Sequence, residues 1–228
     1  MLDHLGGIFD RARAAARATT LNVGTFGSLA PWLFPALEEL LDGVIVNQVT
    51  DHGDRLVEWV GEGSLDAAFV AIANQMRLPA TVSAVPVASD RLARLTPAAL
   101  SVKGGRRPFA GLDVVAYTYD MSTDTLHQRL SELGARPRTA ATAETAVRMA
   151  RLLGCPAVLP RGLGLAYAQE GERVTTMSIP GRLTLFMVTR RPAPQAFAAV
   201  VRRLPGHLGL QRAGRPAPRS RDEGPPHA

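Results

Sequence analysis

A strand-then-helix pattern that occurs twice in succession constrains the fold more than any other feature. Residues 21–25 form a short apolar run, and 29–41 places leucine and alanine side chains at helical spacing on one face. Residues 44–49 and 55–61 repeat the unit, and 65–72 is almost wholly apolar, as in a strand covered on both faces. This alternation predicts a parallel sheet built from right-handed βαβ units.

A second series of elements follows a loop-like stretch at 101–108. The pattern predicts strands over 82–87, 92–96, 114–119, 156–159 and 183–189, helices over 123–133 and 144–153, and an extended segment near Thr139. A last helix over 196–203 has an apolar face that must pack against a sheet, so we expect it to pack on the first series of elements. The predicted fold class is therefore α/β, with two Rossmann-like lobes joined by two crossing strands and a ligand cleft between them.

We place the lobe boundaries where the composition changes. Lobe I is assigned to 21–97 plus 190–209, and lobe II to 98–189. Residues 3–18 have the spacing of an amphipathic helix. Residues 210–228 contain several arginines and prolines without an apolar face, which predicts a disordered basic tail.

The net charge of +6 looks at first like an indication of nucleic-acid binding. From residue 202 onward, however, six arginines stand against two acidic residues, so this stretch carries +4 and the rest of the chain only +2. A solvated tail is the simple interpretation, and weak attraction to polyanions is the alternative.

Several classes of protein are disfavoured by composition. No stretch approaches the roughly 18 consecutive apolar residues of a membrane span, and the charged N-terminal segment does not resemble a signal peptide, so we expect a cytoplasmic protein without membrane contact. The single cysteine, Cys155, leaves no partner for an internal disulfide or a CxxC site. It lies in an apolar context, where a thiol behaves as a small hydrophobic group.

The loop after the first predicted strand is the strongest candidate binding site. Thr25, Gly27 and Ser28 precede a helix, where unpaired backbone N–H groups and the helix dipole favour a carboxylate or another anion. Gly27 permits close approach of a ligand, and the Ser28 hydroxyl adds a donor. The alternative is that Ser28 only caps the helix.

Two further groups of residues should line the same cleft. Thr50, His52 and Gly53 follow the second strand at the equivalent position, although a lone histidine in a turn is often merely solvated. In the second lobe, a buried strand ends in Tyr117, Thr118 and Tyr119. These tyrosines would form a stacking or hydrogen-bonding wall, and structural packing is the alternative.

Sequence motifs give little support to catalysis, a metal site or a cofactor. The chain has no GxSxG, GxxxxGK[ST], GxGxxG or HExxH motif, and its five histidines are scattered. We therefore expect no catalytic residue, no metal and no cofactor.

Four segments together resemble the effector-binding domain of LysR-type transcriptional regulators. They are 21–29 (LNVGTFGSL), 61–69 (GEGSLDAAF), 86–92 (PVASDRL) and 152–160 (LLGCPAVLP), in the family's order, and the similarity spans about 21–209. It implies a type 2 periplasmic-binding-protein-like fold with a small-molecule effector in the cleft. The resemblance also places Thr142 opposite the tyrosines, before the helix at Glu144; both residues could equally be simple caps.

The resemblance has implications for partners. In that family a winged helix-turn-helix and a long linker helix precede this domain, and residues 1–20 resemble only the end of such a linker. The chain as given is thus not expected to bind DNA directly. The family forms head-to-tail dimers or larger oligomers, and here 29–41 and 123–133 would be the matching elements.

The leading hypothesis is therefore a sensing domain that binds a small, anionic metabolite and acts by lobe closure and dimer rearrangement. A second hypothesis is an enzyme on the same scaffold, with His52, Tyr119 and Glu144 as its candidate catalytic groups. A third is a modulator that pairs with a full-length LysR-type regulator and supplies no DNA-binding head.

Overall fold

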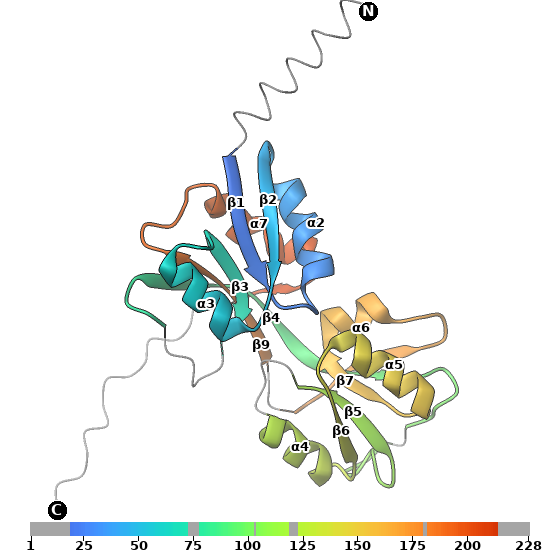
Figure 1. Cartoon of the computed structure of the whole chain (residues 1–228). Helices are drawn as coiled ribbons and strands as arrows, with labels where there is room; N and C mark the ends of the chain where they lie inside the picture. The colour runs from blue at the N-terminus through green and yellow to red at the C-terminus, as the bar shows by residue number, and fades with distance from the viewer. Residues whose placement is uncertain (1–18, 73–77, 103, 119–122, 180–181, 214–228) are drawn as a thin grey trace, which may run out of the picture.

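The computed structural model describes residues 19–72, 78–102, 104–118, 123–179 and 182–213. Figure 1 shows two groups of helices and strands, one above the other, with long strands running between them. The first lobe contains β1 (Thr19–Thr25), α2 (Ala30–Leu40), β2 (Val44–Thr50), α3 (Gly53–Glu62), β3 (Ala67–Ala71) and α7 (Phe197–His207). The second contains β5 (Asp113–Tyr117), α4 (Thr123–Glu132), β6 (Arg136–Ala140), α5 (Ala143–Leu153), β7 (Ala157–Pro160), α6 (Arg161–Tyr167) and β8 (Arg173–Thr176). The remaining strands are β4 (Val82–Thr96), β9 (Arg182–Arg190) and β10 (Gln211–Arg212).

The strands follow the order β2-β1-β3-β9-β4-β7-β5-β6, with β8 and β10 also paired to β4. In the first lobe β1 is parallel to both β2 and β3, and in the second lobe β5 is parallel to both β6 and β7. Each lobe thus contains the parallel βαβ arrangement predicted from the alternating pattern, and the predicted α/β fold class is confirmed.

Both faces of the first-lobe sheet are covered, because successive strand residues point to opposite sides. On β3, Ala67 and Phe69 pack in one core with α2 and α7, whereas Ala68 and Val70 pack in another with α3. The rings of Phe69 and Phe197 meet edge to face, with centroids 6.5 Å apart. Helix α7 therefore returns to the first lobe, as its apolar face predicted.

The second lobe repeats this alternation. Val115 and Tyr117 of β5 pack in the core beneath α5 and α6, and Val114 and Ala116 pack in the core that includes α4. Cys155 lies in the first of these cores, only 4% exposed, and burial raises the pKa of its thiol. This placement agrees with the prediction that the thiol acts as a small hydrophobic group.

One continuous strand links the lobes. β4 is 15 residues long; its first part, Val82–Arg91, pairs with β9, and its second part, Leu92–Leu95, pairs with β7. The sequence analysis predicted two separate strands in this region. They form one strand because Ala88–Arg91, the residues between the two predicted strands, pair with β9.

The structure moves several predicted boundaries. Thr19 and Thr20 pair with β2 as part of β1 rather than belonging to the linker-like segment assigned to 1–20, since β-branched residues suit a strand. The predicted second lobe ran to residue 189, whereas Leu185–Thr189 of β9 pair with β3 in the first-lobe sheet. The predicted tail began at 210, but Gln211–Arg212 pair with β4, after a leucine that packs beside Gly162. The helix predicted over 3–18 and most of that tail lie outside the described residues.

The sequence analysis also missed α6 and β8. Helix α6 has only seven residues and contains two glycines, so it lacks the length on which helical periodicity depends. Strand β8 has four residues and largely exposed side chains, without the apolar alternation of a half-buried strand.

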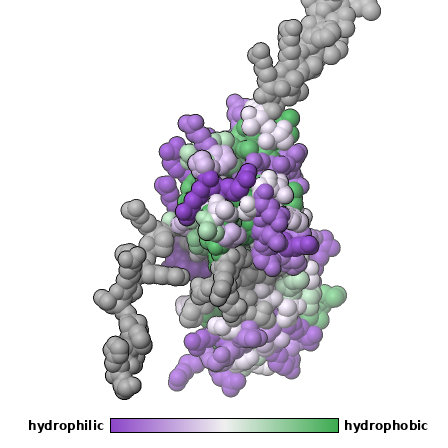
Figure 2. Space-filling view, turned by 60° about the vertical axis from the view of Figure 1, so that its left-hand side comes forward, coloured by the Kyte–Doolittle hydropathy of each residue, from purple (hydrophilic) through white to green (hydrophobic). Residues whose placement is uncertain are grey.

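The surface is mainly polar on the side shown in Figure 2, where hydrophobic residues form small, separate patches. Within the part of the chain that the structure describes, no helix has both the length and the apolar character needed to cross a membrane.

Candidate functional site

Thr25 and Thr50 are partners in the parallel β1–β2 ladder, so the loops that follow them leave the same edge of the first-lobe sheet. The Asp51 N–H donates a hydrogen bond to the Thr25 carbonyl oxygen, at 3.3 Å, which ties the two loops together. The two loops predicted to line the edge of the cleft, which we call the rim, are thus neighbours. His52 is exposed beside them, and its N–H donates to Asp51 Oδ1 at 2.7 Å, while Gly53 is buried.

The predicted donors on the first loop already have internal contacts. The buried Thr25 hydroxyl donates to the Phe69 carbonyl oxygen at 2.7 Å, which fixes the end of β1 to β3. Leu29, not Ser28, occupies the N-cap position of α2, so the interpretation of Ser28 as the cap of its own helix is wrong. Gly27 is exposed, and an added Cβ would meet nothing within 4 Å.

Ser28 instead contacts the other lobe. Its hydroxyl oxygen accepts a hydrogen bond from the Ala143 N–H at 3.1 Å, and Ser28 itself is only 6% exposed. Ala143 is the first residue of α5, so its N–H is one of the donors that a helix leaves unsatisfied at its N-terminus. Thr142 is the N-cap of the same helix and accepts from the Thr145 N–H at 3.0 Å. Residues from both lobes therefore cap α5.

Of the two tyrosines predicted to form a wall at the cleft, the structure describes Tyr117. Tyr117 is completely buried in the second-lobe core, in agreement with the alternative of structural packing. Thr118 is 9% exposed, and its N–H donates to the Ala140 carbonyl oxygen at 3.3 Å. Tyr119 lies outside the described residues.

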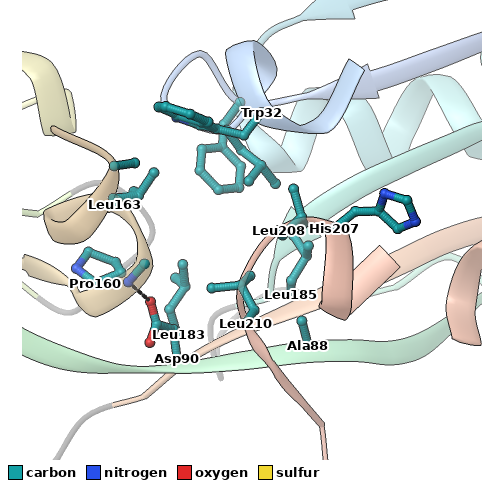
Figure 3. Close-up of a pocket in the computed structure, with 14 residues that line it drawn as sticks. Trp32, Ala88, Asp90, Pro160, Leu163, Leu183, Leu185, His207, Leu208 and Leu210 are labelled. Carbon is teal, nitrogen blue, oxygen red and sulfur yellow. Dashed lines mark hydrogen bonds between the residues drawn. The ribbon is translucent and has the colours of Figure 1, made fainter. Parts of the chain in front are cut away.

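An apolar cavity of about 100 Å³ lies between the lobes, with walls from both (Figure 3). It is lined by Phe26, Leu29 and Trp32 of the first lobe, Ala88, Asp90, Leu183 and Leu185 of the crossing strands, Pro160, Gly162, Leu163 and Ala166 of the second lobe, and His207, Leu208 and Leu210 near the C-terminus. In Figure 3 the His207 ring points away from the cavity, and its Nδ1 lies 3.4 Å from a Glu39 carboxylate oxygen.

Asp90 is an acidic side chain among these apolar walls. Its Oδ2 accepts a hydrogen bond from the Gly162 N–H at 2.6 Å, and its Oδ1 accepts from the Arg91 N–H at 2.8 Å. Burial raises the pKa of this carboxyl, against the opposing effects of the two N–H groups and of the Arg161 and Arg182 charges. A carboxyl on a crossing strand thus holds the first turn of α6.

A second direct contact between the lobes borders the cavity. The Trp32 and Tyr167 rings meet edge to face, with centroids 6.1 Å apart and planes at 89°. Burial and the Glu144 charge raise the pKa of the Tyr167 phenol. Together with the Ser28–Ala143 hydrogen bond, this ring contact holds the lobes against each other around the cavity.

Sequence reasoning missed Asp90, Gly162 and Trp32 as site residues. Asp90 is the one acidic residue of β4, but this strand also contains Arg91 and Arg94, so its sequence context gave only a weak indication. Gly162 and Trp32 could be identified only from the way the lobes meet.

Of the three groups named for the enzyme hypothesis, the structure describes His52 and Glu144, which lie on different lobes. His52 is exposed on the first lobe, and Glu144 is exposed on the second, where it forms an ion pair of 2.7 Å with Arg148. Among the residues that the structure covers, no group of three His, Cys, Asp or Glu side chains could hold a metal ion.

No protein-family model and no curated protein sequence matches the chain. Solved structures do match it. CbnR, a LysR family transcriptional regulator, is 19% identical with a TM-score of 0.63, over 91% of this chain and 75% of CbnR. A full-length OxyR variant from Pseudomonas aeruginosa is 20% identical with a TM-score of 0.64, over 92% of this chain and 80% of OxyR. The effector-binding domain of QuiR in complex with shikimate is 11% identical with a TM-score of 0.61, over 82% of this chain and 97% of the QuiR domain.

At these identities the comparison establishes the fold. The chain has the type 2 periplasmic-binding-protein-like fold of the effector-binding domains of LysR regulators, as the four sequence segments implied. The matched structures named above are transcriptional regulators and an effector-binding domain.

Proposed function

We propose that this chain is the ligand-sensing domain of a LysR-type regulator and that it works in the cytoplasm. The observation that carries the proposal is the cavity whose walls come from both lobes, next to the direct contact between Ser28 and Ala143. A ligand that touches both lobes binds the closed arrangement more tightly than an open one. It therefore shifts the population toward the closed form, in proportion to that difference in affinity.

We keep the prediction that the ligand is anionic, and we place its charged group at the rim, near Ser28 and Ala143. When the lobes separate, the Ala143 N–H loses its Ser28 acceptor and becomes available at the positive end of the α5 dipole. A carboxylate that takes the place of the Ser28 oxygen would restore this hydrogen bond, with the Ser28 hydroxyl as a donor on the opposite side. Shikimate, which is a carboxylate and is bound in the structure of the QuiR domain, is one compound to test.

The proposed response is a change in how two copies pack. Helix α2 and helix α4 lie on different lobes, so a head-to-tail dimer that joins them senses the position of one lobe relative to the other. A larger homo-oligomer, or a dimer with a full-length LysR-type regulator, would use the same surfaces. A chain that stays monomeric in size-exclusion chromatography with light scattering would contradict this part of the proposal.

Lobe movement can be measured with two spin labels. We would label Glu58→Cys on α3 and Gln128→Cys on α4, both at exposed positions, after replacing the buried Cys155 with alanine. A panel of small carboxylates that includes shikimate should narrow the interlobe distance distribution toward the closed value. A single distribution that changes neither with the panel nor in Ser28→Ala would show rigid lobes and overturn the proposal.

A further inference from the structure

The position of Asp90 determines what kind of molecule the interlobe cavity can hold. In Figure 3 the Asp90 side chain rises from β4 at the base of the cavity, with Leu163, Leu183 and Leu210 around the same space. Its two oxygens accept one N–H each, from Gly162 and Arg91. A carboxylate has about four lone-pair positions, so each oxygen retains capacity for another donor.

Anchoring α6 explains only part of this arrangement. The Gly162 hydrogen bond would satisfy one N–H at the start of α6 whether or not the neighbouring space were empty. Asp90 is half-buried, and a carboxylate that faces apolar walls is stabilised less well there than in water unless a donor reaches it. A donor supplied from within the cavity would stabilise the carboxylate.

We infer that this cavity is a binding site for a small apolar molecule that carries one hydrogen-bond donor, such as an alcohol, a phenol or an amine, directed at Asp90. The volume of about 100 Å³ is of the same order as apolar cavities that hold a benzene-sized guest, about 150 Å³. The leucine walls would bury the body of the molecule, and Asp90 would orient its polar end.

The negative charge of Asp90 itself makes the cavity selective against carboxylate ligands. A ligand carboxylate would lie against a like charge inside apolar walls, which is unfavourable on both counts. The cations that face Asp90 are Arg161 and Arg182, both exposed. Arg182 Nη2 donates to Ser89 Oγ at 2.9 Å and to Gln211 Oε1 at 3.2 Å, so this nitrogen is held by neutral partners within the chain. The ligand class of this cavity thus differs from the anion proposed for the rim.

Binding here would also hold the lobes together. Trp32 belongs to one lobe and Ala166 to the other, and both line the cavity. A guest in contact with both walls favours the closed arrangement. This effect on the lobes rests on the proposed function, whereas the binding site itself does not depend on that function.

The test compares phenol with benzoate, which share a ring and differ in the polar group. Binding to the full chain is measured at pH 7 by titration in ¹H–¹⁵N NMR. We expect saturable phenol binding with a Kd on the order of 1 mM, as for a ligand with few heavy atoms. Shift changes should fall on β4 and α6 residues that line the cavity. Benzoate should bind these residues at least about tenfold more weakly.

Two variants assign the site and its polarity. Ala166→Leu fills the cavity from an exposed helical position and should weaken phenol binding at least about tenfold, whereas Leu165→Ala, which changes the exposed neighbour on the same helix, should leave it unchanged. Asp90→Asn removes the charge and should reduce the preference for phenol over benzoate to less than about threefold. The inference is overturned by absent phenol binding, by equal benzoate binding, or by phenol binding that Ala166→Leu does not weaken.

The same samples separate this inference from the proposed function. Phenol binding without any change in the interlobe distance would support the cavity as a binding site and contradict only the closure expected from a guest in it. Closure by carboxylates without phenol binding would support the proposed function and overturn the cavity's assignment.

Discussion

The Ser28 hydroxyl oxygen accepts a hydrogen bond from the Ala143 N–H, although the two residues lie 115 positions apart and on opposite lobes. Ser28 stands on the short loop between β1 and α2, and Ala143 opens α5. This contact makes the end of a second-lobe helix depend on a first-lobe side chain, and it suggests a direct test of lobe coupling.

Ser28→Ala should shift the lobes toward an open arrangement. The lost hydrogen bond is worth about 1 kcal/mol, which corresponds to about a fivefold change in the ratio of closed to open forms. Thr142→Ala removes a cap from the same helix within one lobe, so it should destabilise the protein by about 1 kcal/mol without moving the lobes. Spin-label distances and chemical denaturation distinguish the two results; equal distance distributions in both variants would contradict the prediction.

Gly24→Ala should be far more damaging than Gly27→Ala. A Cβ at Gly24 would lie 2.6 Å from Leu56 Cδ2 and 2.8 Å from Leu65 Cδ1, inside a packed core. We expect a loss of about 1–3 kcal/mol, because both leucines must move. At the exposed Gly27 nothing lies within 4 Å, so the melting temperature should change little. If Gly27→Ala nevertheless weakens carboxylate binding, close approach of a ligand to this loop is supported.

Glu172→Gln should destabilise the second lobe at neutral pH. Arg151 donates two hydrogen bonds of 2.8 Å to Glu172, whose side chain is 6% exposed. These hydrogen bonds lower the pKa of the Glu172 carboxyl. Breaking the pair should cost about 2 kcal/mol by urea denaturation. Glu144→Gln, in the exposed pair with Arg148, is the matched control and should cost less than about 0.5 kcal/mol.

The Glu172 effect has a defined pH dependence. Because the pKa is lower in the folded state than in the unfolded state, the stabilisation is complete above the unfolded pKa and is lost as the pH falls through the folded pKa. The difference in unfolding free energy between the natural chain and Glu172→Gln should therefore shrink in acid. A difference that stays constant down to the acid limit of folding would contradict this assignment.

Asp90 should show the opposite dependence. Burial raises the pKa of its carboxyl above the ordinary value of 3.8, so the folded chain holds this proton more tightly than the unfolded chain. Stability from this group is present below the unfolded pKa and is lost as the pH rises through the raised folded pKa. The natural chain should lose stability relative to Asp90→Asn over that interval. If the unfolding free energies of the natural chain and of Asp90→Asn differ by the same amount at every pH, Asp90 does not cause the effect.

The sequence predicted the lobes well because both depend on regular apolar patterns. The strand over 65–72 and the helix over 144–153 appear as β3 and α5 with small changes at their ends, since burial on defined faces sets their period. The packing of α7 on the first lobe was predicted because its apolar face needed a sheet to cover it. Short elements such as α6 were missed because a glycine-containing turn of helix leaves no such pattern.

The site was harder to predict because it depends on how the lobes meet. Ser28 was identified, but as a donor to a ligand or a cap of its own helix, whereas it accepts from the helix opposite. Tyr117 was chosen for its place at a strand end, yet the alternation of β5 turns it into the core. The partnership of Asp90 with Gly162 joins residues 72 positions apart, which no local spacing reveals.

The ladder between β4 and β9 determines how the halves can move. Over Val82–Arg91 the two strands form a continuous hydrogen-bonded ribbon, interrupted only by the bulge at Pro86 and Ala88. A paired ribbon resists bending within its own plane, because that would stretch the hydrogen bonds along one side, but it twists readily. We therefore expect the lobes to open and close by twisting of this ribbon about its long axis, rather than by bending of the ribbon in its own plane.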